Sequence, residues 1–514
     1  MNKKNLPFIA LFAFLISGCN IPSSDSIPTI SIDDSLPSSI PTYDARLDLK
    51  IVGVNDFHGA VVQDESYGNP GLAALAGALK AFDRDTTVLV NAGDSFQGSI
   101  ESNYNHGELV SKCFAEIGFD AVTIGNHEFD WGSAHIAANG EFFGKPFLGA
   151  NIYHYDMANH QTLGFASDVA GRYEIVEKGA FRVGIIGTIG DNQITSIASQ
   201  FADDFVFIDP IPVIKSISDY LRNSQACDAI ILSHHGRQTE LLDQGLTAVS
   251  PSSGARYIDA AFCGHSHTNE SETENRVAFV QTSGYGTTLD EIDLTLTRRN
   301  GAVTVATSDY STNVNSWGAS DPTVASIVQT YKAVSDEAGQ EKLAQINANF
   351  VTRDQASNLY ARAIYEAAKA VDPDILFAGG NNARSSFYAT SASGKKYITY
   401  ADLYKGLPFD NQIIIGTVTG RDIIREIPYL YIYRESTSVK VEASKTYKVA
   451  LLDYVATHRN ANREYDYYPS FVQTDIIEDT YRDITAEYLR GQTGILDISE
   501  FDVSNPHFDP SLLN

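Results

Sequence analysis

The sequence predicts an α/β protein with two domains joined by a helix. The chain has 514 residues, which is more than a single domain of ordinary size needs. In its first half, short β-rich runs alternate with helical patterns, which favours βαβ units and mainly parallel strands. A helical pattern with little apolar content follows, and such helices often bridge domains. A second alternation of strands and helices then begins near Phe350.

The N-terminus is typical of an export signal. Lys3 and Lys4 precede the apolar run Leu6–Ile16, which is shorter than the roughly 20 residues that span a bilayer. The pentapeptide Leu15-Ile16-Ser17-Gly18-Cys19 resembles the lipobox of bacterial lipoproteins. That resemblance implies that residues 1–18 are removed and that Cys19 is acylated. The alternative is an ordinary signal cleaved a few residues later.

The mature N-terminus is expected to hold the protein at a membrane. Asn20 follows Cys19, and the absence of Asp there favours the outer membrane of a Gram-negative cell. Residues 19–45 are rich in Ser, Pro, Ile and Asp without a sustained period, which predicts a flexible tether. We therefore expect an exported, lipid-anchored protein, and we expect it to be monomeric.

The first domain is predicted over residues 46–315. Its expected strands and helices are, in chain order, Leu47–Val52, Gly71–Phe82, Thr87–Val90, Glu108–Ile117, Ala121–Ile124, Val183–Ile186, Pro212–Asn223, Ala229–Leu232 and Ala260–Cys263. Val277–Gln281 and Glu291–Thr297 are expected to be later, antiparallel strands. A linker helix is predicted within residues 316–346, with its helical pattern running from Pro322 to about Ile346, and a second domain over 347–514.

Charge excludes one class of partner. The 37 Lys and Arg against 64 Asp and Glu give a formal charge of −27. Proteins that bind DNA or RNA gain most of their affinity by neutralising phosphates with cations. A nucleic-acid polymer is therefore not the expected partner, although a small phosphate compound can still bind in a local positive pocket.

Polar clusters follow the predicted strands of the first domain. They are Asn55-Asp56-Phe57-His58, Asn91-Ala92-Gly93-Asp94, Gly125-Asn126-His127-Glu128, Ser233-His234-His235-Gly236 and Gly264-His265-Ser266-His267. Ligands of open parallel sheets bind beyond the carboxyl ends of the strands, so these turns can converge. Each motif alone occurs by chance, but six of the twelve histidines fall in these turns.

The residue types in these clusters suit divalent metal ions. Asp56 and His58 are two residues apart on an extended segment, so their side chains point to the same side and can bind one cation. His265 and His267 have the same spacing. Asp94 has two oxygens with which to bridge two cations. Carboxylate, amide and imidazole ligands together favour Zn, Mn, Co or Fe over an ion selected by thiolates.

In this order, the motifs resemble those of the calcineurin-like metallophosphoesterases. Asn-Asp-Phe-His-Gly and Gly-Asn-His-Glu-Phe-Asp-Trp-Gly are similar to the periplasmic 5′-nucleotidase and UDP-sugar hydrolase branch. The resemblance implies a four-layer α/β/β/α sandwich that holds two divalent metal ions. It assigns Asp56, His58 and His267 to one metal, Asn126, His234 and His265 to the other, and Asp94 to both. His127, oriented by Asp130, would assist the reaction without binding metal.

The second half resembles the substrate domain of the same family, with departures. The resemblance implies that Arg353 and Arg384 bind phosphate, and that Phe409 and Tyr454 cover the two faces of a nucleobase; for these two aromatics, simple core packing is the alternative. Asp466 resembles a ribose-binding Asp, but the sequence around it lacks the family's glycines. The family's base-contacting Asn falls at Gly379, where Asn381 or Asn382 is a substitute.

The resemblance implies an extracytoplasmic 5′-nucleotidase that releases phosphate from nucleotides. Cleavage of UDP-sugars or NAD-type dinucleotides is an alternative that needs a roomier pocket, and hydrolysis of cyclic nucleotides is another. A non-catalytic nucleotide-binding lipoprotein is a fourth possibility, which loss of metal ligands would indicate. Every ligand that the family pattern requires is present in the sequence.

Overall fold

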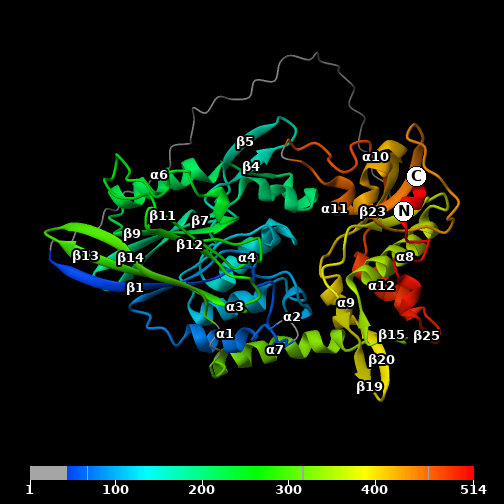
Figure 1. Cartoon of the computed structure of the whole chain (residues 1–514), viewed down its shortest axis with the longest axis horizontal. Helices are drawn as coiled ribbons and strands as arrows, with labels where there is room; N and C mark the ends of the chain where they lie inside the picture. The colour runs from blue at the N-terminus through cyan, green and yellow to red at the C-terminus, as the bar shows by residue number, and fades with distance from the viewer. Residues whose placement is uncertain (1–42, 66–67, 315–317, 461) are drawn as a thin grey trace, which may run out of the picture. The chain divides into compact units, whose positions relative to one another are not determined.

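The computed structural model describes residues 43–65, 68–314, 318–460 and 462–514 (Figure 1). The predicted signal peptide, Cys19 and tether residues 19–42 lie outside this part. Among the described residues, no helix combines the length and apolar composition needed to cross a membrane. The described chain is a mixed α/β protein, which confirms the predicted fold class.

Two sheets form the centre of the first domain. One has the order β14-β13-β1-β2-β3 and the other β11-β12-β10-β9-β7-β6. The first comprises β14 (Ala302–Val314), β13 (Leu289–Arg299), β1 (Ala45–Val54), β2 (Thr87–Asn91) and β3 (Ala121–Val122). The second comprises β11 (Glu270–Glu274), β12 (Val277–Gln281), β10 (Ala260–Phe262), β9 (Ala229–His235), β7 (Phe181–Ile189) and β6 (Tyr173–Lys178).

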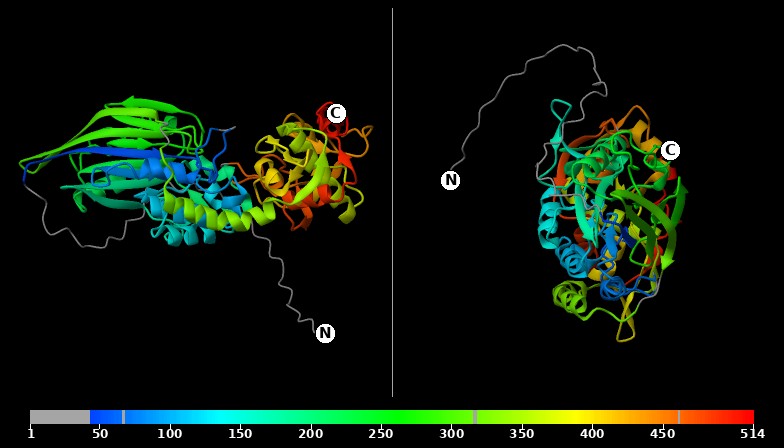
Figure 2. Two further views of the ribbon diagram at one scale, coloured as in Figure 1. Left: turned by 90° about the horizontal axis from the view of Figure 1, so that it is seen from below. Right: turned by 90° about the vertical axis from the view of Figure 1, so that its left-hand side faces the viewer.

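The two sheets pack face to face, with helices on their outer faces (Figures 1 and 2). Alternate residues such as Ile51, Val90 and Ile231 fill the space between the sheets. Helices α1 (Leu72–Leu79), α3 (Glu108–Ile117) and α4 (Ser133–Phe143) cover the first sheet, and α6 (Pro210–Asn223) covers the second. These layers are the predicted α/β/β/α sandwich.

One strand pairing differs from the sequence expectation. β13 is antiparallel to β1, as expected, but β12 is parallel to β10 and antiparallel only to β11. All five residues of β12 are buried. A strand covered on both faces is a continuous apolar run in which sequence alone cannot show direction.

The helix between the domains is shorter than predicted. α7 spans Pro322–Gly339, with Asp321 as its N-cap, and residues Lys342–Ile346 form strand β15 instead of continuing it. Leu343 and Ile346 are buried in the second domain, where β15 pairs with β20 (Lys395–Thr399) and β25 (Ile495–Leu496). Burial of these side chains in a sheet outweighs the helical propensity of the segment.

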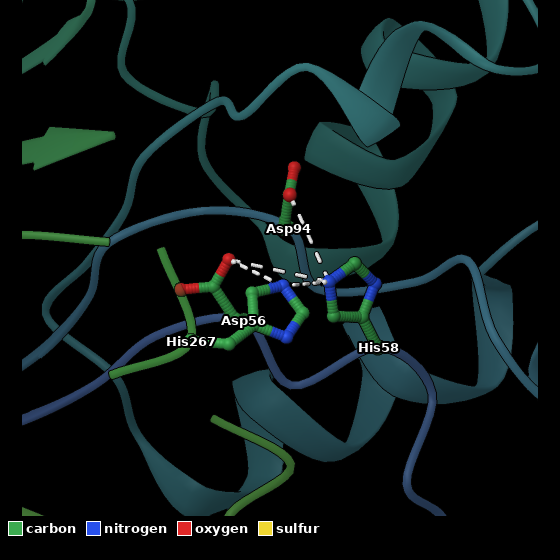
Figure 3. A group of neighbouring side chains, drawn as sticks. All are labelled: Asp56, His58, Asp94 and His267. Atoms are coloured by element: carbon green, nitrogen blue, oxygen red, sulfur yellow. Dashed lines mark hydrogen bonds and ion pairs between the residues drawn. The ribbon is translucent and has the colours of Figure 1, made fainter. Parts of the chain in front are cut away.

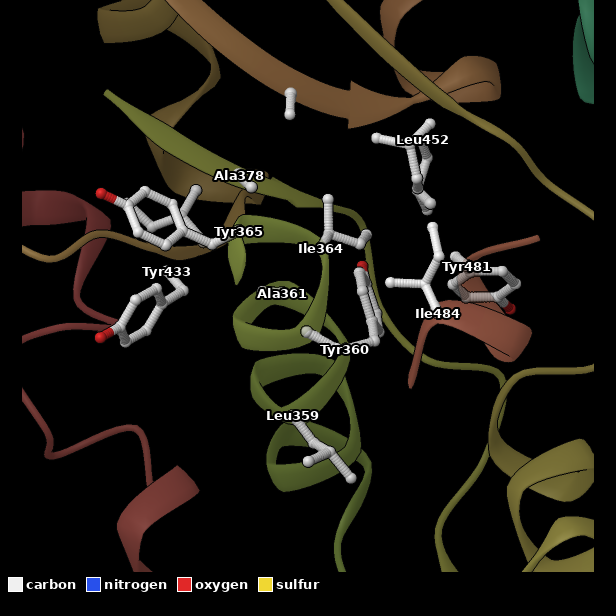
Figure 4. Packing of buried hydrophobic residues seen from close by; sticks show 14 of the residues in the cluster. Leu359, Tyr360, Ala361, Ile364, Tyr365, Ala378, Tyr433, Leu452, Tyr481 and Ile484 are labelled. Carbon is white, nitrogen blue, oxygen red and sulfur yellow. The ribbon is translucent and has the colours of Figure 1, made fainter. Parts of the chain in front are cut away.

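The second domain has its own core around helix α8 (Arg353–Val371) (Figure 4). Thr352 and Gln355 form a capping box that starts this helix. The helix packs on a sheet of β22 (Tyr431–Tyr433), β17 (Phe377–Gly380), β23 (Thr446–Leu452), β21 (Ile413–Thr419) and β24 (Val472–Ile477), and against α12 (Tyr481–Arg490). A smaller sheet adds β19 (Thr390–Ala392) to β20, β15 and β25.

Candidate active site

The polar turns that follow the parallel strands meet at one end of the first domain. Asp56 and His58 follow β1, Asp94 follows β2, and the turn after β3 carries Asn126. Parallel strands present their carboxyl ends at the same edge, so residues distant in sequence are brought together there.

One cluster comprises Asp56, His58, Asp94 and His267 (Figure 3). The Nε2 atoms of His58 and His267 are 3.0 Å apart. His267 Nε2 lies 3.4 Å from Asp56 Oδ1, and His58 Nε2 lies 3.8 Å from Asp94 Oδ2. All four ligand atoms lie within 4.8 Å of one another, so a single cation can reach each of them.

The second cluster comprises Asp94, Asn126, His235 and His265. His235 Nε2 lies 3.1 Å from Asn126 Oδ1 and 3.3 Å from Asp94 Oδ2. His265 Nδ1 lies 3.0 Å from the same amide oxygen. Asp94 thus belongs to both clusters, which is the arrangement that the sequence predicts for a bridging carboxylate.

The second cluster corrects one predicted ligand. His235, and not His234, faces Asp94 and Asn126. Both are fully buried residues of β9, but successive side chains of a strand point to opposite faces. His234 Nδ1 therefore lies 2.9 Å from the Thr188 hydroxyl, and its Nε2 lies 3.4 Å from Glu240 Oε2.

The backbone at the clusters is strained. Five of the clustered residues have φ in the left-handed region, which non-glycine residues seldom adopt. They are Asp56 (48°), His58 (48°), Asp94 (55°), His265 (75°) and His267 (52°). Such conformations persist where the surrounding structure enforces them, and they are concentrated at functional sites.

Outer contacts orient the imidazoles. His58 Nδ1 lies 2.8 Å from the Gln97 carbonyl oxygen, and His235 Nδ1 lies 2.8 Å from that of Ala92. A ring whose Nδ1–H donates to a carbonyl presents its Nε2 lone pair to the cluster. This is the tautomer that a metal-binding histidine needs.

Three imidazoles are held neutral. Burial is the main cause that lowers the pKa of His265 to about 4 and of His267 to about 3, and the nearby positive groups His235 and Arg384, respectively, add to it. Burial and Arg384 also hold the pKa of His58 well below its usual range. Metal ligation requires the neutral ring, which these three histidines have. Burial would lower the pKa of His235, but the Asp94, Asp56 and Glu128 carboxylates outweigh burial and raise it to about 10, so a cation bound at the second cluster has to displace that proton.

His127 and Asp130 form a separate pair beside the clusters. His127 Nδ1 lies 2.8 Å from Asp130 Oδ2, and its backbone N–H donates to Asp94 Oδ1 over 2.9 Å. Burial would lower the pKa of His127, but the Asp130 and Asp94 carboxylates outweigh burial and raise it. The pair therefore favours a protonated imidazole in contact with the metal-binding region.

A cavity of about 370 Å³ opens beside the clusters, and both domains line it. Arg353, Arg384, Phe409 and Tyr454 are all at its wall. A guanidinium nitrogen of Arg384 lies 3.3 Å from His58 Nε2, which places this positive charge at the first cluster. Phe409 stacks on the His127 ring with centroids 5.5 Å apart.

Asp466, which was predicted to bind ribose, does not line this cavity. Its backbone N–H donates to the His458 carbonyl oxygen, and its carboxylate lies 3.8 Å from His458 Nδ1. Here Arg459 forms an antiparallel bridge with Tyr465, and Tyr467 stacks on His458, where the family has a glycine-rich loop. Asn381 and Asn382 line the cavity, whereas a side chain at Gly379 would collide with the Tyr431 carbonyl.

Two residues of the site were not predicted. The buried Glu128 carboxylate accepts hydrogen bonds from the backbone N–H groups of Asp94, Ser95 and Gly125, at 2.6–3.0 Å. It thereby fixes the turn that carries Asp94. Phe201, in the short helix α5 (Ser199–Ala202), lines the cavity from the first domain. The Gly-Asn-His-Glu motif contained a signal for Glu128, but no motif marks Phe201.

Comparison with known proteins matches both domains. Residues 49–269 match the calcineurin-like phosphoesterase family, and residues 335–428 match the 5′-nucleotidase C-terminal domain. An apyrase of Tabanus yao is 30% identical over 45% of this chain, but the match spans only 42% of the apyrase. A 5′-nucleotidase of Vibrio parahaemolyticus is 23% identical, over 91% of this chain and 93% of the relative.

The fold is also shared with a solved structure. The 5′-nucleotidase precursor of Thermus thermophilus has a TM-score of 0.67 at 17% identity, over 86% of this chain and 96% of that one. The two family matches confirm the resemblance in the sequence for both domains, and the solved structure shows that the fold is shared.

Proposed function

We propose that this chain, which belongs to the metallophosphoesterases that carry a 5′-nucleotidase C-terminal domain, hydrolyses nucleotides to nucleoside and phosphate. The observation that carries the proposal is the cavity that Asn126 and His265 of the second cluster line together with His127, Arg353 and Arg384. The relatives named 5′-nucleotidase support the choice of substrate.

Two divalent cations, of Zn, Mn, Co or Fe, are proposed as the cofactors. Asp56, His58 and His267 would hold one, Asn126, His235 and His265 the other, and Asp94 both. When bound, these cations would lower the pKa of a water molecule and stabilise negative charge on the phosphoryl oxygens.

Side chains of the protein position the phosphate and donate a proton to the leaving group. Arg384 lies next to the first cluster and Arg353 on the same cavity wall, so two guanidinium groups can bind phosphate oxygens by paired hydrogen bonds. His127 holds a proton, which it donates to the leaving ribose oxygen. Asp130 fixes its ring by bonding Nδ1, which leaves Nε2 to face the substrate.

The base is proposed to bind between Phe409 and Tyr454, with Asn381 and Asn382 at its edge. Aromatic faces stack on any base, so the altered segment at residues 458–467 is compatible with nucleotide binding. For Asp466 we propose no contact with ribose.

The test is steady-state phosphate release from AMP, UDP-glucose, NAD and cyclic AMP by purified protein whose metals are quantified. AMP should be the best substrate; turnover of UDP-glucose, NAD or cyclic AMP alone would support the corresponding alternative. A protein that turns over none of them would contradict the proposal.

His127→Ala separates an enzyme from a nucleotide-binding protein. We expect kcat for AMP to fall by about 10²–10⁴-fold, the usual contribution of a positioned acid or base. Metal content should be unchanged, because His127 is outside both ligand sets. An unchanged rate would remove His127 from the mechanism.

The proposed location is outside the cytoplasm, with a monomer held to a membrane by lipid on Cys19. The sequence Leu15-Ile16-Ser17-Gly18-Cys19 is its support. Incorporation of labelled palmitate that persists after Cys19→Ala would refute the anchor.

A further inference from the structure

The first domain contributes an aromatic wall to the substrate cavity. Ser196, Ala198 and Phe201 line the cavity together with residues of the second domain. Phe201 belongs to α5 and is partly buried. A Cβ added at Gly132, two residues beyond Asp130, would lie 3.6 Å from the Phe201 ring, so the ring lies close to the His127–Asp130 segment.

Hydrogen bonds tie α5 to the helix that carries Tyr454. That helix is α11 (Asp453–Thr457). The Ser199 hydroxyl donates to Thr457 Oγ1 over 2.7 Å, and Gln200 Nε2 donates to Asp453 Oδ2 over 3.1 Å. Because these bonds flank Tyr454 on its helix, they place Phe201 at the Tyr454 end of the cavity. Arg384, beside His58, marks the opposite, phosphate-binding end.

This end of the cavity is held in a fixed arrangement. The buried Asp453 carboxylate also accepts hydrogen bonds from Asn411 Nδ2 and from the Tyr454 backbone N–H, each over 2.6 Å. After α5, the Asp203 carboxylate accepts a bond of 3.0 Å from Arg459. These bonds fix the short helices that carry Phe201 and Tyr454, so less conformational entropy is lost there when a ligand binds.

We propose that Phe201 determines specificity by contacting, from the phosphoesterase domain, the edge of a nucleobase whose two faces are covered by Phe409 and Tyr454. The ligand class is a nucleoside 5′-monophosphate, and the inference rests on the proposed function. Phe201 has no part in holding metal or phosphate. It therefore raises the preference for nucleotides over phosphate esters that lack a base.

The test compares AMP with ribose 5-phosphate, which has the same phosphate and sugar without a base. Phe201→Ala should lower kcat/KM for AMP by about 2- to 10-fold, the range for loss of one edge-to-face aromatic contact. For ribose 5-phosphate the change should be less than about twofold, because no base reaches Phe201. Phe142→Ala is the matched control, since Phe142 lies on α4 outside the cavity and is 38% exposed.

Phe201→Leu separates an aromatic contact from side-chain bulk, and it keeps the test valid if the Ala variant fails to fold. Leu keeps an apolar side chain beside Gly132 but has no ring, so it should lose most of the preference for AMP. A Leu variant that keeps the wild-type ratio of AMP to ribose 5-phosphate turnover would overturn the inference. Equal losses on both substrates, or no loss on either, would also overturn it and leave the proposed function standing. Wild-type protein inactive on both substrates would overturn the proposed function, and the inference with it.

Discussion

The last residues of β9 decide which of two adjacent histidines belongs to the candidate site. His234 and His235 are equally buried, yet only His235 reaches Asn126 and Asp94. The His234 ring instead contacts the Thr188 hydroxyl and the Glu240 carboxylate. Since neighbouring strand residues face opposite ways, a shift of one residue in the family alignment exchanges the ligand for its neighbour.

His235→Ala should therefore remove one metal ion, whereas His234→Ala should keep both. Loss of one of the four donors around the second cation weakens its binding, and the shared Asp94 cannot replace an imidazole. Metal per chain, measured by elemental mass spectrometry after gel filtration, checks the prediction, with His234→Ala as the matched control. If His235→Ala keeps two metal ions and His234→Ala loses one, His234 is the ligand, as predicted from the sequence.

Much of the site follows from the sequence at this scale. Asp56, His58, Asp94, Asn126, His265 and His267 were predicted because each follows a β-rich run, and strand ends meet at one edge of a sheet. The choice between His234 and His235 depends on which of these two residues of β9 points toward the cluster. The sequence of β9 does not reveal this, because both histidines follow the same apolar run. Asp466 was placed by analogy with a glycine-rich loop, and without those glycines the segment folds differently.

At the scale of elements, β13 carries an unusual residue into the space between the sheets. Its inward positions Ile292, Leu294 and Leu296 are apolar, but Asp290 on the same strand is 1% exposed. Neither carboxylate oxygen has a hydrogen-bond partner among the described residues. Burial alone raises the pKa of Asp290 to about 8.

Asp290 should make stability fall as the pH rises. In the unfolded chain the carboxyl loses its proton near pH 4, whereas the folded chain keeps it up to about pH 8. The folded state thus binds more protons between these values, and the free energy of unfolding decreases across the window. Asp290→Asn removes the ionisable group, so its advantage over wild type should grow to a few kcal/mol by pH 9.

Urea unfolding at pH 5, 7 and 9 measures this difference. The control is Asp293→Asn on the same strand, because Asp293 is partly exposed and pairs with Lys50 over 2.8 Å. Its effect on the free energy of unfolding should be small, as is usual for an ion pair near the surface. If the difference in free energy of unfolding between Asp290→Asn and wild type is the same at pH 5, 7 and 9, the Asp290 carboxyl does not titrate in this range.

Elements with strong local signals were predicted well, and those set by tertiary contacts were not. Residues Glu108–Ile117 were predicted as a helix and form α3 without a change of boundary. The helical pattern after Pro322 was extended too far, because Leu343 and Ile346 gain more from the second core than from a longer helix. Helix α5 has four residues, too few for a periodic signal, and Phe201 was missed with it.

At the scale of the whole molecule, two separate cores meet at the substrate cavity. The core around α8 shares no residue with the two clusters of buried apolar residues in the first domain. Individual polar bonds connect them, such as Asn103 Nδ2 to the Pro408 carbonyl oxygen and Trp131 Nε1 to Asp410 Oδ2, at 2.8 and 3.0 Å. Every proposed metal ligand is in the first domain. The two cores can therefore respond differently to the loss of metal.

Removal of metal with EDTA should destabilise the first domain selectively. Without a cation, the buried carboxyls of Asp56 and Asp94 repel each other; burial, and to a smaller extent Asp94, raises the pKa of Asp56 to about 6. Ions present at about 100 times their dissociation constant stabilise a folded domain by about 2.7 kcal/mol. For a domain of this size that corresponds to a shift in Tm of about 5–10 °C.

Differential scanning calorimetry of the full chain, with and without EDTA, tests this expectation. One transition should move down and return when Mn²⁺ or Zn²⁺ is restored, while the transition of the second domain stays in place. His235→Ala should show a smaller shift, because it has one ion fewer to lose. If both transitions move together, the domains unfold as one unit, and if neither moves, the clusters hold no metal that contributes to stability.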